Sequence, residues 1–287
     1  MSTLAILLVL AAAVAHASWN VIAHGASRSG LPFLWAGSVA STVLWLPVVP
    51  LTGGIGAGEL QGFAIGVAVS AALHVAYMLV LQRGYAVGNL STVYATARGS
   101  GPLITVVIAV AVLGERPAPI ALVGVAAIIV GVIGIGFIDR RSPTRAGRFD
   151  PAIMFGLLTG AAIAAYTLWD AQALRTWSIS PVAFMVGCTA LEVPVFTALL
   201  GRRLPEGLRT LRRDWRRLLV FGILSPLSYI LVLAAVTIAP VSIVAPMREV
   251  SVVLVSLFGA FVLREARPGA RLFASAVVVA GIALLAV

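Results

Sequence analysis

The sequence contains very little charge and almost no cysteine. Only 10% of its 287 residues are charged and 61% are hydrophobic, whereas soluble domains contain about 25% charged residues. Such a chain cannot cover a folded core with polar side chains, which excludes an ordinary soluble protein. Its single cysteine, Cys188, excludes an intramolecular disulfide and a Cys-x-x-Cys metal site. The sequence also lacks a phosphate-binding loop and a His-Glu-x-x-His motif, so we predict no metal site and no cofactor.

The apolar residues form continuous runs of the length that a helix needs to cross a bilayer, about 20 residues. They do not alternate with polar residues as in a membrane β-barrel. The first run lacks the preceding basic residues of a signal peptide, so we expect it to remain as a helix. The sequence therefore predicts an all-α membrane protein with ten transmembrane helices. The ten runs are 3–23, 32–51, 61–82, 91–113, 118–138, 152–169, 181–200, 218–237, 242–263 and 270–287.

Two of these runs contain charges that recur at one spacing. Arg98 and Glu115 in the first half correspond to Arg248 and Glu265 in the second half, without a gap. This internal repeat predicts two halves of five helices, residues 1–138 and 152–287, joined by a basic loop at 139–151. Because five is odd, the second half must be inverted relative to the first in the membrane.

The arginines predict the orientation of the chain. All 20 basic residues are arginine, and 16 of them follow odd-numbered runs whereas two follow even-numbered runs. Basic loops stay in the cytoplasm, so both termini are expected on the outer side of a bacterial cytoplasmic (inner) membrane. We interpret the charge as this orientation signal rather than as a nucleic-acid surface. The expected partners are the lipid bilayer and a small-molecule substrate, with no nucleic acid.

Several motifs resemble those of a known family. Trp19-Asn20 lies near the end of the first run, and Gly114-Glu115-Arg116 precedes a run that contains Gly124 and Gly131. With ten runs in two halves, the chain resembles the EamA-type transporters of the drug/metabolite transporter superfamily. The resemblance implies secondary export of a small metabolite by alternating access, by a monomer or a homodimer.

Arg98 and Arg248 are the main candidates for substrate binding. Each arginine lies about 10 Å along its helix, at a rise of 1.5 Å per residue. Because the halves are predicted to be inverted, the two arginines would enter the membrane from opposite sides. Guanidinium groups there suit a carboxylate or a phosphate-like group, as in an amino acid, a drug or a phosphonate. The alternative is structural, in which each arginine caps helix carbonyls or forms an ion pair.

Three further buried groups are candidates for proton coupling: Glu249, Glu192 and His16. Burial favours the neutral form of a carboxyl group, so Glu249 or Glu192 could exchange a proton during transport. Alternatively, each glutamate pairs with an intramembrane arginine and does not titrate.

His16 and Trp19 share one helix face, and Tyr166 and Trp169 occupy the corresponding positions in the second half. One hypothesis is a wall of the substrate cavity. The other is that the tryptophans anchor helix ends at the membrane surface. In the second case two neighbouring polar residues would cap the helices, namely Asn20 and Asp170. His74 and Tyr77 on the third run are secondary binding candidates.

Four other residues are assigned structural roles. Glu115 and Glu265 are expected to end helices. Pro102 and Pro246 lie inside their runs, where each removes a backbone donor and is expected to kink the helix near an arginine.

A different class of function stays open. Paired arginines also bind phosphates, so an intramembrane enzyme or a flippase that acts on a lipid-linked phosphate head group is the alternative to a transporter. The sequence has no catalytic constellation that would favour an enzyme.

Overall fold

The computed structural model describes residues 2–22, 30–87, 90–138, 151–261 and 267–286. This part of the chain is helical and contains no β-strand; an isolated bridge joins Gly56 and Ile179. Short 3-10 helices lie at Leu46–Val48, Pro50–Thr52 and Gly201–Arg203. The α-helices are α1 (Thr3–Ile22), α2 (Leu31–Trp45), α3 (Leu60–Val87), α4 (Leu90–Ala111), α5 (Pro119–Ile138), α6 (Pro151–Trp177), α7 (Pro181–Leu200), α8 (Leu204–Arg213), α9 (Trp215–Ile238), α10 (Val241–Met247), α11 (Val250–Phe261) and α12 (Pro268–Ala286).

The prediction of an all-α membrane protein is confirmed. Nine spans within the described residues are long and apolar enough to cross a bilayer, and residues Gly269–Leu285 of α12 form a shorter apolar helix. Several helices begin at a proline, which suits a first turn because the missing N–H would have no partner there. The arrangement as two inverted repeats stays a prediction.

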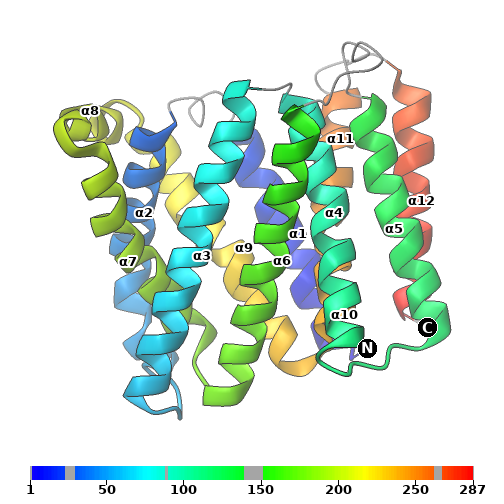
Figure 1. The fold of residues 1–287 in the computed structure, drawn as a ribbon, viewed down its shortest axis with the longest axis horizontal. Coiled ribbons are helices and arrows are strands. Elements are labelled where there is room, and N and C mark those ends of the chain that lie inside the picture. The colour runs from blue at the N-terminus through cyan, green and yellow to red at the C-terminus, as the bar shows by residue number, and fades with distance from the viewer. Residues whose placement is uncertain (1, 23–29, 88–89, 139–150, 262–266, 287) are drawn as a thin grey trace.

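The helices run roughly parallel, with α2 and α7 at one edge and α5 and α12 at the other (Figure 1). The most extensive packing joins α4 to α6, α5 to α12, α1 to α9 and α3 to α6. Both termini lie at the same end of the bundle, and α8 lies at the opposite end (Figure 1). Segments from both halves of the chain therefore surround the centre.

Glycines allow α5 and α12 to approach closely. A Cβ atom on Gly124 would lie 2.6 Å from the carbonyl oxygen of Gly281, and one on Gly281 would lie 2.6 Å from that of Gly124. Both distances are shorter than a van der Waals contact, so any larger residue would push the helices apart. Glycine is thus required where the backbones of the two helices meet.

The ninth predicted run is two helices rather than one. The chain turns at Arg248-Glu249 between α10 and α11, and Glu249 N–H donates to the carbonyl of Pro246 at 3.0 Å, a contact three residues apart. Pro246 lies two residues before this turn, and the bond that it removes is the one to the carbonyl of Ser242. The helix is therefore interrupted shortly after the predicted kink position. Pro102, by contrast, lies inside α4, which continues to Ala111 without interruption.

Two further expectations need correction. Seven of the arginines counted after odd-numbered runs lie between the seventh and eighth runs, from Arg202 to Arg217, in a connection expected to be a loop. This connection contains a helix, α8. Asp170 does not cap a helix end, because α6 continues beyond the predicted boundary to Trp177. The basic loop at 139–150 and Glu265 lie outside the described residues.

Glu115 and Arg175 connect four helices at the end of the bundle that contains the termini. The Glu115 carboxylate accepts hydrogen bonds from the N–H groups of Val241 and Ser242, both at 2.9 Å, in the first turn of α10. Arg175, in the last turn of α6, lies 3.4 Å from Glu115 and donates to the carbonyls of Val236 and Ala239 at the end of α9. Gly114, at φ 69°, provides the left-handed turn that directs Glu115 to these partners.

These contacts act on the pKa of Glu115 in opposite directions. Partial burial raises the pKa, whereas the hydrogen bonds from Ser242 and Val241 and the contact with Arg175 lower it, and the net shift is downward. A carboxyl group with a lowered pKa in the folded state stabilises the fold above its ordinary pKa. That contribution is lost as the pH falls toward the lowered value.

We expect Glu115→Gln to lower the free energy of unfolding by about 1 kcal/mol at neutral pH, because the substitution removes a charge-assisted cap from α10. The difference from the unchanged protein should shrink as the pH is lowered. Denaturant unfolding of the purified protein at several pH values measures both effects. Glu59→Gln, an exposed glutamate just before α3, is the matched control. An equal loss in both variants would contradict the capping role.

Candidate functional site

Arg98 and Glu249 form a buried ion pair in the interior of the bundle. Arg98 Nη1 on α4 donates to both carboxylate oxygens of Glu249, at 3.2 and 3.3 Å. Their side chains are 10% and 1% exposed. The break between α10 and α11 places Glu249 opposite α4. Residues from the two halves of the chain therefore meet in one contact.

Arg248 lies beside the same carboxylate. Its Nε atom is 3.8 Å from Glu249 Oε1, the oxygen that Arg98 also contacts. Arg248 Nε is buried and has no hydrogen-bond partner among the described residues. Two guanidinium groups thus share one carboxylate, which leaves one positive charge in excess and one buried donor unused.

His16 and Trp19 extend this cluster on α1. Arg98 Nη2 donates to His16 Nε2 at 2.8 Å, so this nitrogen has no proton in the structure. The His16 ring contacts Trp19 edge to face at 5.0 Å, and Trp19 contacts Phe221 on α9 in the same way. Asn20 donates to the His16 carbonyl within α1 rather than facing the ion pair.

Tyr166 belongs to a second polar cluster. Its ring stacks on His74 at 4.1 Å and contacts Tyr77 edge to face at 5.4 Å. Asp170, one turn further along α6, accepts a hydrogen bond from Tyr229 at 2.5 Å and lies 4.0 Å from His74 Nε2. Helices α3, α6 and α9 therefore bring an imidazole, a carboxylate and phenol rings together.

Glu192 and Trp169 lie at the edge of this second cluster. Glu192 on α7 is buried and accepts a hydrogen bond from Ser38 on α2 at 2.7 Å. One of the two interpretations of the sequence paired Glu192 with an intramembrane arginine, but its described hydrogen-bond partner is this serine. Trp169 donates to the carbonyl of Gly66 at 3.0 Å and packs against Trp177.

The structure thus divides the predicted site residues between two clusters. One contains His16, Arg98, Arg248 and Glu249, and the other contains His74, Tyr77, Tyr166 and Asp170. Sequence analysis missed Ser38 and Tyr94, whose ring lies 5.2 Å from the Arg98 guanidinium. Tyr94 could have been found by its spacing of four residues from Arg98 on one helix. No sequence signal pointed to Ser38.

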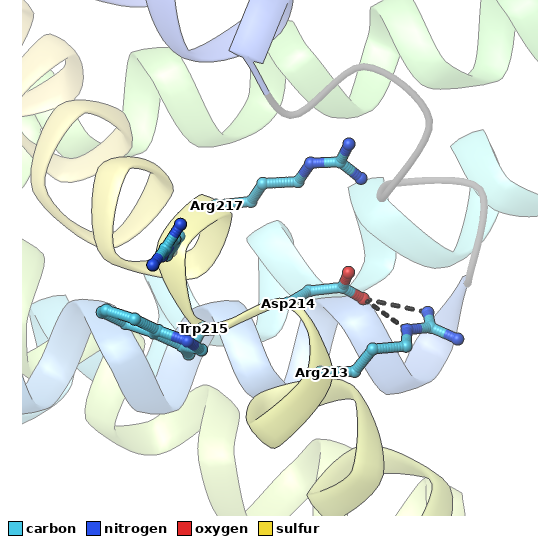
Figure 2. A pocket seen from close by; sticks show the side chains of 5 residues that line it. Arg213, Asp214, Trp215 and Arg217 are labelled. Atoms are coloured by element: carbon cyan, nitrogen blue, oxygen red, sulfur yellow. Dashed lines mark hydrogen bonds and ion pairs between the residues drawn. The ribbon is translucent and has the colours of Figure 1, made fainter.

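A third polar feature lies at the surface, where α8 meets α9. A cavity of about 440 Å³ is lined by Arg213, Asp214, Trp215, Arg216 and Arg217. Figure 2 shows Arg213 and Arg217 extending to the same side, with Asp214 paired to Arg213 at 2.9 Å. Arg216 lies over the Trp215 ring at 5.3 Å. This corner is basic, and none of its lining residues belongs to either buried cluster.

Comparison with known proteins identifies the second half of the chain. Residues 150–287 match the model of the EamA-like transporter family. This half belongs to the EamA-like transporter family. The family expected from the motifs is thereby confirmed for these residues, and its members are membrane transporters rather than enzymes. The EamA-like half supplies Arg248, Glu249 and Asp170.

The fold of the whole chain is also found in a solved structure. That structure, described only as the crystal structure of a protein, has a TM-score of 0.70 and 16% identity over 99% of this chain and 96% of the other chain. At this identity the likeness shows the fold alone. No curated protein matches the chain. The EamA-like half and the apolar helices make the chain a multi-pass integral membrane protein for transmembrane transport.

Within the described residues no group of three or more His, Cys, Asp or Glu side chains could bind a metal ion. The polar side chains of the two buried clusters are arginine, carboxylate, imidazole and phenol groups.

We expect Glu249→Gln to lower the free energy of unfolding by about 3 kcal/mol or more, because it leaves two buried guanidinium groups without a counter-charge. The double variant Arg98→Gln/Glu249→Gln should lose less free energy of unfolding than the sum of the two single variants, because the two residues form one pair. Denaturant unfolding of the four proteins measures this coupling.

The exposed pair Arg203 and Glu206, 2.9 Å apart, is the control. The same cycle there should give a coupling near zero. Equal coupling for the two pairs would contradict a special contribution from the buried one.

Proposed function

We propose that the chain is a secondary transporter that binds a small anionic metabolite at Arg98 and Arg248. The observation that carries this proposal is the shared carboxylate: Arg98 and Arg248 both approach Glu249 Oε1. A buried site with one positive charge in excess favours an anion. Arg248 Nε is an unused donor at this point.

The chemistry of guanidinium groups favours a carboxylate, phosphate or phosphonate as the bound group, because their planar donors match its oxygens. Glu249 would compete with the substrate for the same donors. Such competition offsets part of the positive charge when the site is empty and weakens binding enough for release. His16 and Tyr94, which contact Arg98, would complete one side of the site.

Alternating access is supported by the packing of the two halves. Helix α1 packs on α9, and α6 packs on α3. In the predicted repeat α1 corresponds to α6 and α3 to α9, so these two contacts are equivalent. The break between α10 and α11 lies at Arg248-Glu249, beside the proposed site. Interrupted helices at substrate sites are typical of transporters with inverted repeats. We propose that one half moves against the other about this site.

The orientation proposal is that the α8 end faces the cytoplasm of a bacterium and that both termini lie outside. Seven exposed arginines lie in or beside α8, between Arg202 and Arg217. Arg175, in the last turn of α6, and Arg116, between α4 and α5, belong to the other end, where Glu115 contacts Arg175. The basic corner of Figure 2 belongs to the α8 end. This asymmetry is the one that the positive-inside rule describes. Export across the inner membrane is the corresponding direction of transport.

A thermal-shift screen of the purified protein against carboxylates, phosphates, phosphonates and amino acids tests anion binding. We expect an anion to stabilise the protein. Arg98→Gln or Arg248→Gln should weaken binding by about tenfold or more, since a charged hydrogen bond contributes about 1.5–3 kcal/mol. Uptake of that anion into proteoliposomes should fall in parallel.

Arg209→Gln, on the exposed face of α8, is the matched control and should leave binding and uptake unchanged. Undiminished uptake by folded Arg98→Gln and Arg248→Gln proteins would overturn the proposed site.

The orientation can be tested by labelling single introduced cysteines in intact cells with a membrane-impermeant maleimide. Ser2→Cys near the N-terminus should react from outside, whereas Arg212→Cys on α8 should react only after the membrane is broken. Both positions are exposed, and the native Cys188 is buried. The opposite pattern of labelling would reverse the proposed orientation.

A further inference from the structure

Asp170 occupies an unusual environment for a carboxyl group. Its side chain is 0% exposed on α6, and Oδ2 accepts a hydrogen bond from Tyr229 on α9. Oδ1 is buried and has no hydrogen-bond partner among the described residues. No arginine forms an ion pair with it in the described part of the chain. A lone buried carboxylate is costly, so the site requires a compensating positive charge or a proton.

The geometry of His74 indicates where such a proton would be bound. His74 Nδ1 lies 3.0 Å from the carbonyl oxygen of Ser70, one turn earlier on α3. Nδ1 is also 3.2 Å from Ser70 Oγ, a hydroxyl that can accept or donate. We assign the hydrogen to Nδ1, because the carbonyl oxygen only accepts and the other tautomer would direct the Nδ1 lone pair at it. In the neutral ring Nε2 is then unprotonated, and this nitrogen faces Asp170 Oδ2 at 4.0 Å. Without a further proton, a lone pair and a carboxylate would face each other.

The buried cations do not compensate Asp170 directly. Arg98 and Arg248 both approach the carboxylate of Glu249, and Arg271 lies in the first turn of α12 at the end of the bundle. A proton on the His74 and Asp170 pair would supply the compensating positive charge at this point.

The surroundings of the pair fix its geometry. The His74 ring is stacked on Tyr166, and the Tyr229 ring contacts it edge to face at 5.4 Å. These contacts prevent the ring from turning away from Asp170. The titratable and charged groups that act on the pair from the helices packed around it are Tyr77 on α3, Tyr166 on α6, Cys188 and Glu192 on α7, Tyr229 on α9 and Arg248 at the end of α10.

We propose that His74 and Asp170 together bind one exchangeable proton and form the proton-coupling site of the transporter. The pair takes the proton from water when the bundle is open to one side and returns it to water when it is open to the other. No other bond is made or broken. In the occluded state the pair is neutral overall, and after release it has one negative charge. Tyr229 keeps Oδ2 directed at His74.

The coupling to the anion site would be electrostatic. The charge of Arg248 acts on Asp170, and Arg248 is also one of the two proposed anion ligands. An anion bound at Arg248 therefore changes the affinity of the pair for its proton, and the proton changes the affinity for the anion by the same factor. This part rests on the proposed function, whereas proton binding by the pair does not.

Proton binding can be tested on the full-length protein without a substrate. The protein is prepared in lipid nanodiscs with isotope labels on histidine ring nitrogens and aspartate carboxyl carbons, and NMR spectra are recorded from about pH 5 to about pH 9. We expect one titration step that appears at both His74 Nε2 and the Asp170 carboxyl, while Nδ1 keeps its hydrogen.

In Asp170→Asn the His74 ring should remain in its neutral form with the hydrogen on Nδ1 over this range. His74→Gln should remove the shared step from Asp170. Asp214→Asn at the surface corner is the control and should leave the step unchanged. The proposal is overturned if neither His74 nor Asp170 titrates, or if the titration step survives Asp170→Asn. It is also overturned if Glu192→Gln, rather than Asp170→Asn, removes the step.

A transport experiment separates this proposal from the proposed function. It uses proteoliposomes and an anion found in the thermal-shift screen. For Asp170→Asn, accumulation driven by a pH gradient should fall by about tenfold, while exchange of labelled for unlabelled anion without a gradient should persist.

If the unchanged protein transports no anion, the proposed function fails and the NMR result still decides whether the pair binds a proton. If the unchanged protein accumulates the anion and Asp170→Asn does so equally well, the proposed function stands and the coupling site is wrong.

Discussion

The structure depends on compensating charge inside an apolar bundle. An isolated charge at the centre of a membrane helix costs about 2.5–3.5 kcal/mol even on insertion scales, and this interior contains two arginines and three carboxyl groups. Each of these charges needs a compensating group close by. The contact of Arg98 with Glu249 joins the two halves of the chain, and Arg248 approaches the same carboxylate. The need to place these charges side by side favours one specific packing of the helices, a constraint that purely apolar helices would not impose.

Helix α10 links that interior to the end of the bundle. It has seven residues, about 10 Å at 1.5 Å per residue. Glu115 caps its first turn, and Arg248 and Glu249 follow its last. Glu115 also contacts Arg175, which donates to the final carbonyls of α9. Glu115 and α10 thus connect the ends of α6 and α9 to Arg248 and Glu249 through a continuous set of contacts.

The membrane class and the arginines at depth were predictable because each is a local property of the chain. The length of the apolar runs predicts the number of membrane spans. A proline inside a run, such as Pro246, indicates a position where the helix is weakened. The partners of the buried groups were not predictable in this way. Glu192 was expected near an arginine but accepts a hydrogen bond from Ser38, which is 154 positions away. Asp170 looked like a helix cap because the sixth helix was predicted to end at Trp169, whereas it continues to Trp177.

By itself the sequence determined that this chain is a bundle of membrane helices with two arginines among apolar residues, since hydropathy and charge are fixed residue by residue. Only the tertiary structure decided which charges meet. The contact between Arg98 and Glu249 spans 151 positions and that between Tyr229 and Asp170 spans 59, and both depend on how helices lie side by side. Helix packing sets those distances, and in an apolar interior a few ångströms separate a compensated charge from an uncompensated one.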